Sequence, residues 1–437
     1  MTASGDKISL GTATSITIAN MVGTGVFTSL GFQLAGIGQG FSLLLLWTVG
    51  GVLALCGALT YGELAAALPR SGGEYNFISR SIHPSVGFLC GWVSLTLGFG
   101  PPIALAAIAF GEYFGQVVDI PTTALACGVV GVVTLFHLWN LQIGSAFQNV
   151  FTVFKVLLIL AFMAVPFFTD KRSEIGFLPQ DGWVDEVLSA PFGVSLLFVM
   201  FAYTGWNAAT YIVGEVRDPQ RTVPQALFLG TAGVMLLYVA VHWAFLVTTP
   251  ADAIRGQVEV GWAVATHVFG AEAGRWVALL LSVALVSTIS AMTWAGPRVT
   301  QTMGEDYAVF SALGRTNARG IPVYAILLQT AIVFTMILTA TFDKILVYVQ
   351  FILTASSALA VLGVFVLRAR SPELPRPYKT LGYPVTPAIF LVLSVITMIW
   401  VFVDRPWESL AGLLTVLAGV PFYLWSPRLD NEDVLNS

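Results

Sequence analysis

The chain has 437 residues, of which 56% are hydrophobic and only 10% are charged, well below the roughly 25% charged residues of soluble domains. This composition predicts an integral membrane protein, and the net charge of −4 gives no indication of a nucleic acid partner. The three cysteines and four histidines lack the spacing of metal ligands, so we expect no metal, no cofactor and no disulfide.

Twelve apolar segments are long enough to cross a bilayer, which takes about 20 largely apolar residues. They span residues 12–36, 41–67, 84–117, 122–139, 147–168, 190–214, 224–248, 273–302, 322–340, 345–367, 384–403 and 408–425. Most of the 20 Lys and Arg residues fall in connections on the side of the N-terminus, so both termini are expected in the cytoplasm. The longer connections on the other side, about 169–189 and 249–272, are expected to serve mainly as links.

The first span is interrupted at residues 20–27, Asn-Met-Val-Gly-Thr-Gly-Val-Phe. An interior glycine costs a helix roughly 1 kcal/mol relative to alanine, and backbone groups released in lipid need another partner. Such a break therefore favours a polar cavity, although glycines that merely allow close helix packing are the alternative. We expect the free N–H groups of Thr24, Gly25 and Val26 to favour an anion and the free C=O groups of Met21 and Val22 to favour a cation. A zwitterionic α-amino acid carries both charges on one carbon.

Two spans between the breaks carry residues that are unusual in membrane helices. Pro101 and Pro102 lie midway along the third span and should kink it. Lys155 lies in the fifth span, about 13 Å from its cytoplasmic start at 1.5 Å per residue. An ionisable residue at this depth is a functional candidate, with a side chain that reaches back to the interface as the alternative.

A second break is predicted in the sixth span, where residues 201–207 read Phe-Ala-Tyr-Thr-Gly-Trp-Asn. Interrupted helices at corresponding positions in two halves indicate the binding site of an inverted-repeat transporter. The repeats would cover residues 1–168 and 190–367, followed by two further helices at 384–425 and a cytoplasmic tail at 426–437. An aromatic stripe buried in the bundle is the alternative for this segment.

Other polar and aromatic residues in the spans are predicted to form ion pairs or to lie near the pocket. Glu63 and Glu215 lie near the cytoplasmic ends of the second and sixth spans, and we expect ion pairs there rather than proton relays. The residues that either line the pocket or pack beside it are Asn20, Tyr203, Trp206, Asn207 and Trp294.

These motifs carry a resemblance to a known family. Residues 22–27 resemble the Gly-(Ser/Thr)-Gly-(Ile/Val)-Phe signature of the amino acid–polyamine–organocation (APC) superfamily, and residues 201–207 are similar to the sixth-helix motif of its L-type amino acid transporter and bacterial amino acid permease branch. Further similarity lies at residues 61–64, 69–75, 214–219 and 376–379, so it covers nearly the whole chain. The resemblance implies an all-α polytopic fold of twelve transmembrane helices, a five-plus-five inverted repeat (LeuT-like) with helices one and six broken.

The resemblance also implies roles for individual residues. The substrate carboxylate would be held by the N–H groups of Thr24, Gly25 and Val26, and Phe201 would cover the substrate as a gate. The ammonium would meet the carbonyls of Met21, Val22, Phe201, Ala202 and Thr204. Lys155 would replace a bound sodium ion. Thr204 stands where many carriers of large neutral amino acids have glycine, which favours small or medium substrates.

The sequence therefore predicts a sodium-independent secondary transporter of neutral L-amino acids that works by exchange or proton symport, in the plasma membrane of a prokaryote. A sodium-coupled symporter and a non-transporting, amino-acid-sensing membrane protein are the alternatives, and an enzyme is not expected. No cysteine follows the third span in the outer connection, so no disulfide-linked heavy subunit is expected.

Overall fold

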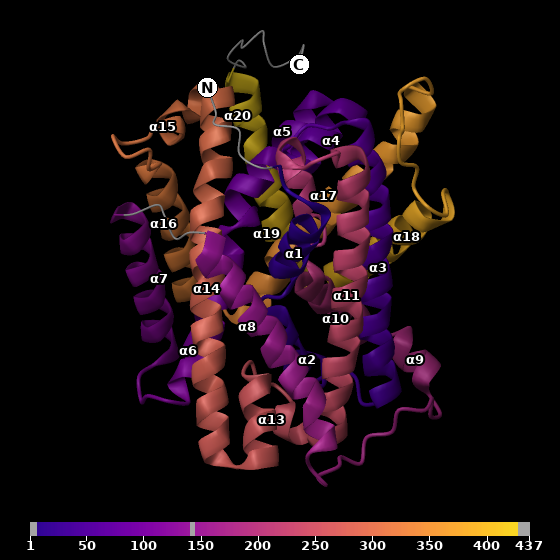
Figure 1. Cartoon of the computed structure of the whole chain (residues 1–437), viewed down its shortest axis with the longest axis vertical. Helices are drawn as coiled ribbons and strands as arrows, with labels where there is room; N and C mark the ends of the chain where they lie inside the picture. Colours follow the sequence, from indigo (N-terminus) through magenta and orange to yellow (C-terminus); the bar gives the residue numbers. More distant parts are fainter. Residues whose placement is uncertain (1–6, 140–144, 427–437) are drawn as a thin grey trace.

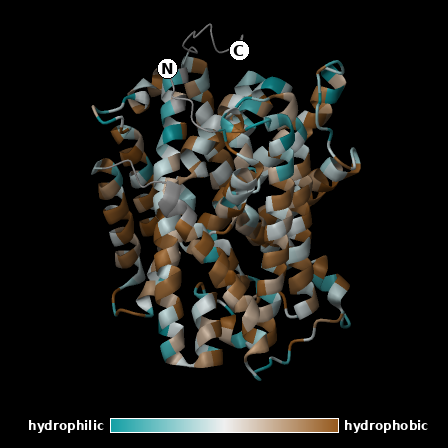
Figure 2. Cartoon of the chain, viewed as in Figure 1, coloured by the Kyte–Doolittle hydropathy of each residue, from teal (hydrophilic) through white to brown (hydrophobic). Residues whose placement is uncertain are grey.

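The computed structural model describes residues 7–139 and 145–426, so most of the tail expected at 426–437 lies outside the described residues. Long helices run roughly along one direction and enclose α1 and α10 at the centre of the bundle (Figure 1). Apolar residues cover the middle of these helices (Figure 2). In the described part of the chain, pairing between extended segments is limited to an isolated bridge between Ile8 and Val216.

Ten segments in the described chain are long and apolar enough to cross a membrane. They are Gly40–Ala67, Pro84–Gly115, Thr122–Trp139, Val150–Phe167, Ala190–Glu215, Pro219–Thr248, Ala271–Glu305, Phe342–Arg370, Val385–Asp404 and Pro406–Trp425. The remaining two predicted spans are the divided first span and the shorter apolar helix α16 (Val323–Thr339). The prediction of an all-α polytopic membrane protein is confirmed.

The first half of the chain contains the divided first span and the four spans after it. Its helices are α1 (Leu10–Met21), the 3₁₀ turn η1 (Gly25–Phe27), α2 (Ser29–Gln33), α3 (Gly40–Ala67), α4 (Gly73–Ser81), α5 (Pro84–Val93), the π-helical turn η2 (Ser94–Gly98), α6 (Gly100–Gly115), α7 (Thr122–Trp139), α8 (Ser145–Ala164) and the 3₁₀ turn η3 (Val165–Phe167). The short helix α4 lies in a connection where the sequence indicated only turns.

The second half begins with the divided sixth span. Its helices are α9 (Trp183–Val187), α10 (Ala190–Tyr203), the 3₁₀ segment η4 (Ala208–Glu215), α11 (Pro219–Thr248), α12 (Ala251–Ile254), α13 (Val260–Phe269), α14 (Ala271–Asp306), η5 (Ala308–Phe310), α15 (Ser311–Gly314), α16 (Val323–Thr339), α17 (Phe342–Arg370), α18 (Val385–Asp404), α19 (Pro406–Leu417) and α20 (Gly419–Trp425). Below, the α4 end denotes the top of the bundle in Figure 1 and the α13 end denotes the bottom.

The structure adds detail to two local expectations, the kink of the third span and the connection 249–272. The third span is two helices joined by a π-helical turn, and Pro101 and Pro102 lie in the first turn of α6, where an N–H would have no helical partner in any case. The connection 249–272 is also more than a link. It contains α12 and α13, and the N–H of Gly256 donates to the carbonyl of Gly31 on α2. This connection therefore packs against the far half of the first broken helix.

Candidate substrate site between two broken helices

The two predicted breaks lie side by side. The helical segment α1 ends at Met21 and α10 ends at Tyr203, and each is followed by a 3₁₀ segment after a short unwound stretch. A Cβ on Gly25 would come within 2.6 Å of the Cα of Ala202. Gly205 has φ +105°, and a Cβ there would lie 2.7 Å from the carbonyl carbon of Asn20. Only glycine permits this approach, so the two breaks form one structural unit.

The first break leaves hydrogen-bond donors free. The helical backbone hydrogen bonds stop at Val22, whose N–H donates to the carbonyl of Ile18. They resume at Phe27, whose N–H donates to the carbonyl of Thr24. Within the described residues, the N–H groups of positions 24–26 have no hydrogen-bond acceptor in the chain. A short helix-like turn with unpaired N–H groups is a favourable place for an anion.

At both breaks, some carbonyl oxygens already accept a hydrogen bond from the protein itself. The hydroxyl of Tyr238 on α11 donates to the carbonyl of Met21 at 2.6 Å. The carbonyl of Phe201 accepts from the N–H of Thr204 at 3.0 Å. A carbonyl oxygen has two lone pairs, so each can accept one further donor. Sequence reasoning did not find Tyr238, because it lies 217 positions from its partner in an ordinary apolar span.

A cavity of about 1920 Å³ connects the breaks to the α4 end of the bundle. It reaches Ile8 and the residues Ser71 and Gly72, which precede α4. The residues predicted for the site that line this cavity are Asn20, Met21, Val22, Thr24, Gly25, Lys155, Phe201, Ala202, Tyr203, Thr204, Trp206, Asn207 and Trp294. Val26, Glu63 and Glu215 are not part of its lining.

Packed side chains close the opposite side of the breaks. The ring of Phe32 on α2 stacks on Phe342 with centroids 5.6 Å apart and lies 5.4 Å from the ring of Phe198. The hydroxyl of Tyr113 on α6 donates to the carbonyl of Phe27 at 2.8 Å and accepts from the N–H of Gly261 on α13 at 3.0 Å. The structure is therefore open toward the α4 end and closed toward the α13 end.

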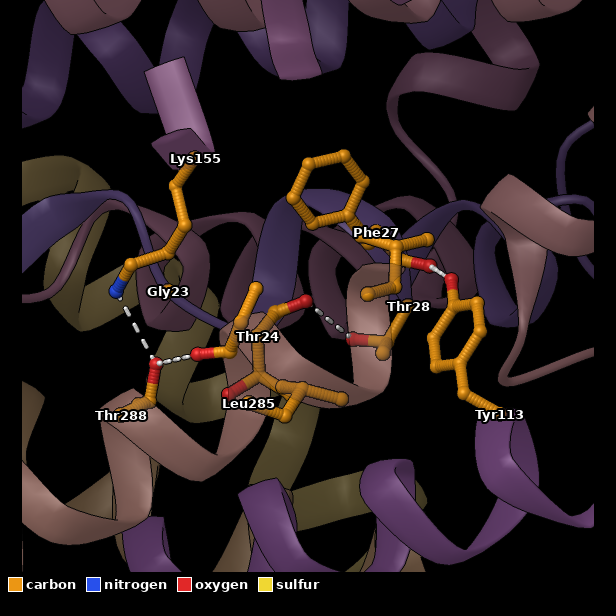
Figure 3. Close-up of a pocket in the computed structure, with 10 residues that line it drawn as sticks. Gly23, Thr24, Phe27, Thr28, Tyr113, Lys155, Leu285 and Thr288 are labelled. Atoms are coloured by element: carbon orange, nitrogen blue, oxygen red, sulfur yellow. Dashed lines mark hydrogen bonds between the residues drawn. The ribbon is translucent and has the colours of Figure 1, made fainter. Parts of the chain in front are cut away.

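Lys155 lies beside the first break, as Figure 3 shows. Its Nζ donates to Oγ1 of Thr288 on α14 at 3.2 Å, and 7% of the residue is exposed. A cavity of about 10 Å³ lies next to it, near the smallest space that holds one water molecule. Gly23, Thr24 and Thr28 of the first break also line this cavity. The ammonium thus lies between the first and eighth spans.

Comparisons with known proteins were made for the whole chain. A family model described as amino acid permease matches residues 8–419. The chain belongs to this amino acid permease family. It is accordingly a membrane transporter and not an enzyme.

The permease is similar to several amino acid transporters. It is 26% identical to the serine/threonine exchanger SteT of Bacillus subtilis over 431 residues, covering 95% of the permease and 96% of the relative. It is also 26% identical to the mouse large neutral amino acids transporter small subunit 2 over 432 residues, covering 95% and 80% of the two chains. The mouse b(0,+)-type amino acid transporter 1 is 26% identical over 430 residues, covering 93% and 85%.

The aromatic and amide residues predicted around the pocket mostly engage neighbouring elements. The Tyr203 hydroxyl donates to the carbonyl of Trp47 at 3.1 Å. The ring of Trp206 lies edge-on to those of Tyr61 and Phe390, with centroids 4.6 Å and 6.1 Å apart. Trp294 is 40% exposed, and Arg298 lies over its ring at 3.2 Å. The amide of Asn20 donates to the carbonyl of Ile16 in its own helix at 2.8 Å.

The two glutamates expected in ion pairs behave differently. Glu63 pairs with Arg368 at 2.6 Å and with Arg376 at 3.6 Å, and it accepts from the N–H and hydroxyl of Thr380 at 2.7 Å. Its partners are thus far away in the sequence rather than nearby arginines. Glu215 has no ion pair within the described residues and its side chain is exposed. The main chain of Glu215 is nevertheless held in place, because its carbonyl accepts from the N–H of Ile8 at 3.0 Å.

Sequence reasoning missed Glu74, which anchors the second break. This residue lies in the first turn of α4 and is 9% exposed. Its carboxylate accepts from the amide of Asn207 at 2.5 Å, from the hydroxyl of Tyr211 at 2.6 Å and from the hydroxyl of Tyr61 at 3.0 Å. The only sequence signal was its place in the motif at residues 69–75. Through Glu74, α4 is fixed to η4.

Proposed function

We propose that the permease carries small to medium neutral L-amino acids without sodium, by exchange or proton symport with alternating access. The main support for sodium-independent transport is the position of Lys155. Its side-chain nitrogen lies between the first break and Thr288, where its protonated form would supply a positive charge. A sodium ion bound in the same small cavity would be repelled by that charge at short range.

The substrate would bind as a zwitterion across the first break. The carboxylate would accept from the free N–H groups of Thr24, Gly25 and Val26, which lack acceptors in the described chain. The ammonium would lie against the carbonyls of Met21, Val22, Phe201, Ala202 and Thr204. The side chain of Phe201 lines the cavity at the second break and would act as the gate.

The same proposal covers topology. We assign residues 1–168 and 190–367 to two inverted repeats, with breaks at equivalent places, and residues 384–425 to two added helices. The α4 end would face the cytoplasm of a prokaryotic cell, with both termini on that side. We also propose that the permease works without a disulfide-linked heavy subunit, because no cysteine lies in the outer connection after the third span.

The names of the relatives support the proposed chemical class of the substrate. Two of the relatives are named for serine/threonine exchange and for the transport of large neutral amino acids. Both names favour a neutral substrate, and the first favours exchange. The narrower preference for small or medium side chains rests on Thr204, which lines the cavity.

Flux of labelled alanine into proteoliposomes tests the proposal. We expect the same flux in sodium and in choline, and Lys155→Ala should lower it at least about tenfold, because a buried charged hydrogen bond contributes about 1.5–3 kcal/mol. Lys344→Ala, which removes an exposed lysine from α17, is the matched control and should leave flux unchanged. Flux that requires sodium would reject sodium independence. Normal flux in Lys155→Ala would remove the lysine from the mechanism.

A further inference from the structure

A row of hydrogen-bonded side chains leads from the second break to α17. Oγ1 of Thr204 donates to Oε1 of Gln350 at 3.1 Å, and Nε2 of Gln350 donates to Oγ1 of Thr354 at 3.2 Å. Gln350 is 5% exposed and Thr354 is 1% exposed. All three residues line the large cavity. A buried amide therefore lies directly beside the break that the substrate would contact.

This amide keeps unused hydrogen-bonding capacity. A glutamine side chain has two N–H donors and an oxygen with two lone pairs. The hydroxyl of Thr204 uses one lone pair, and Thr354 accepts one N–H, so one donor and one lone pair remain. The hydroxyl of Thr204 also lies 3.2 Å from the carbonyl of Met200, one turn back in α10. Its single proton can point to only one of these two acceptors at a time. A further polar group in the cavity can thus bond to Gln350 or Thr204 without breaking the helix.

We infer that Gln350 and Thr204 form a specificity-determining pair that recognises a hydroxyl or amide on the side chain of the substrate. The inference rests on the proposed function and names the substrate class within it, short polar neutral amino acids. Bound threonine would extend the chain of hydrogen bonds. Valine has the same shape with a methyl in place of the hydroxyl, and it would cover the spare donor and acceptor without satisfying them.

The physical basis is the cost of leaving a buried polar group unpaired. Sites that bond a substrate hydroxyl discriminate strongly against an analogue that lacks it, whereas apolar pockets discriminate weakly between substrates of similar shape. The isosteric pairs threonine and valine, and serine and 2-aminobutyrate, isolate this effect because side-chain volume is held nearly constant.

Competition against labelled alanine exchange in proteoliposomes measures two preference ratios, the affinity for threonine over valine and the affinity for serine over 2-aminobutyrate. For the wild type we expect threonine over valine and serine over 2-aminobutyrate by about tenfold, equivalent to about 1.4 kcal/mol. In Gln350→Met, which keeps the volume and removes the amide, both ratios should approach one. Thr204→Val removes the hydroxyl alone and should reduce both ratios in part.

A second buried glutamine provides the control. Gln329 on α16 is 7% exposed and donates to the carbonyl of Met292, but it is not among the residues that line the cavity. Gln329→Met should leave both ratios unchanged. A loss of affinity for all four competitors in Gln350→Met, with the ratios kept, would show a purely structural role and overturn the inference.

The wild-type ratios test the pair even where a variant does not fold. Alanine exchange with ratios near one would overturn the inference and leave the proposed function standing. Absence of any neutral amino acid exchange would instead reject the proposed function.

Discussion

The two broken helices meet at one site but are held in different ways. At the first break, hydroxyl groups of Tyr238 and Tyr113 donate to the carbonyls of Met21 and Phe27, while the N–H groups of residues 24–26 have no acceptor within the described residues. At the second break, side chains of the break itself reach outward. Asn207 bonds to Glu74 on α4. Under the proposed function, the first break would bind the substrate, and the second break, held by Glu74, would move with the α4 end.

This contrast explains the asymmetry of the cavity. The first break is tied to the closed α13 end through Tyr113 and Gly261. The second break is tied to the open α4 end through Glu74. Under the proposed alternating access, closing the α4 end would move η4 and α4 together, since three hydrogen bonds to the buried carboxylate of Glu74 join α4 to its neighbours. Alternating access would then depend on the strength of these two sets of contacts.

The most severe way to disturb this arrangement is to separate the two breaks. Gly205→Ala adds a Cβ 2.7 Å from the backbone of Asn20 at φ +105°, a conformation that costs an L-residue about 1–3 kcal/mol even without the clash. We expect alanine flux to fall to the level of empty liposomes and the melting temperature to fall.

A glycine elsewhere supplies the control for this variant. Gly233 on α11 has open space around the position of its Cβ. Gly233→Ala should therefore be neutral or slightly stabilising, by at most about 1 kcal/mol. Normal flux in Gly205→Ala would show that the close approach of the breaks is not needed.

Weakening the anchor of the second break should have the next largest effect. Glu74→Gln replaces a carboxylate that accepts from three donors by an amide with one acceptor oxygen, at a cost of about 1–3 kcal/mol. Thermal melting in detergent should show this loss, and flux should fall several-fold. Glu305→Gln, at an exposed residue of α14, should change stability by less than about 0.5 kcal/mol. Equal stability of the two variants would contradict the anchoring role.

Thr204→Gly tests the size of the substrate pocket at the second break. Removing this side chain from the cavity wall should improve competition by leucine and phenylalanine about fivefold or more, because added space for apolar groups contributes about 1–3 kcal/mol. Thr335→Ala removes an exposed threonine side chain whose hydroxyl bonds only within α16, and it should leave the competition profile as it is. An unchanged profile in Thr204→Gly would remove Thr204 from the pocket argument.

The smallest expected effect concerns the closed α13 end. Burial raises the pKa of Glu259 at the start of α13, and the neighbouring carboxylate of Glu112 adds to the rise. Because the folded pKa exceeds the unfolded value, this group contributes stability that is present at low pH and is lost as the pH rises from the unfolded pKa through the folded pKa. At neutral pH, Glu259→Gln should raise the melting temperature slightly, since its amide oxygen can still accept from Gln116.

The difference in melting temperature between Glu259→Gln and the wild type should shrink as the pH falls toward 4.5, the ordinary pKa of this carboxyl. A difference that stayed constant with pH would contradict the burial argument.

The sequence by itself determined the membrane class, the number of spans and the places of the two breaks. These properties are local, because an apolar run of sufficient length predicts a span and glycines within it predict an interruption. The same local reasoning made Lys155 a functional candidate, and the structure places its side chain beside the first break. Such reasoning also predicted that the third span is disturbed near Pro101 and Pro102, but the π-helical turn that precedes them and starts a new helix there is visible only in the structure.

Only the tertiary structure decided which distant side chains meet. Glu74 and Asn207 are 133 positions apart, and Thr204 and Gln350 are 146 apart. Glu63 pairs with Arg368 across 305 positions, whereas Glu215 is left exposed. In a bundle of helices, each partner is fixed by helix rotation and packing, which depend on all neighbouring helices together. The pattern of one segment carries no information about that choice.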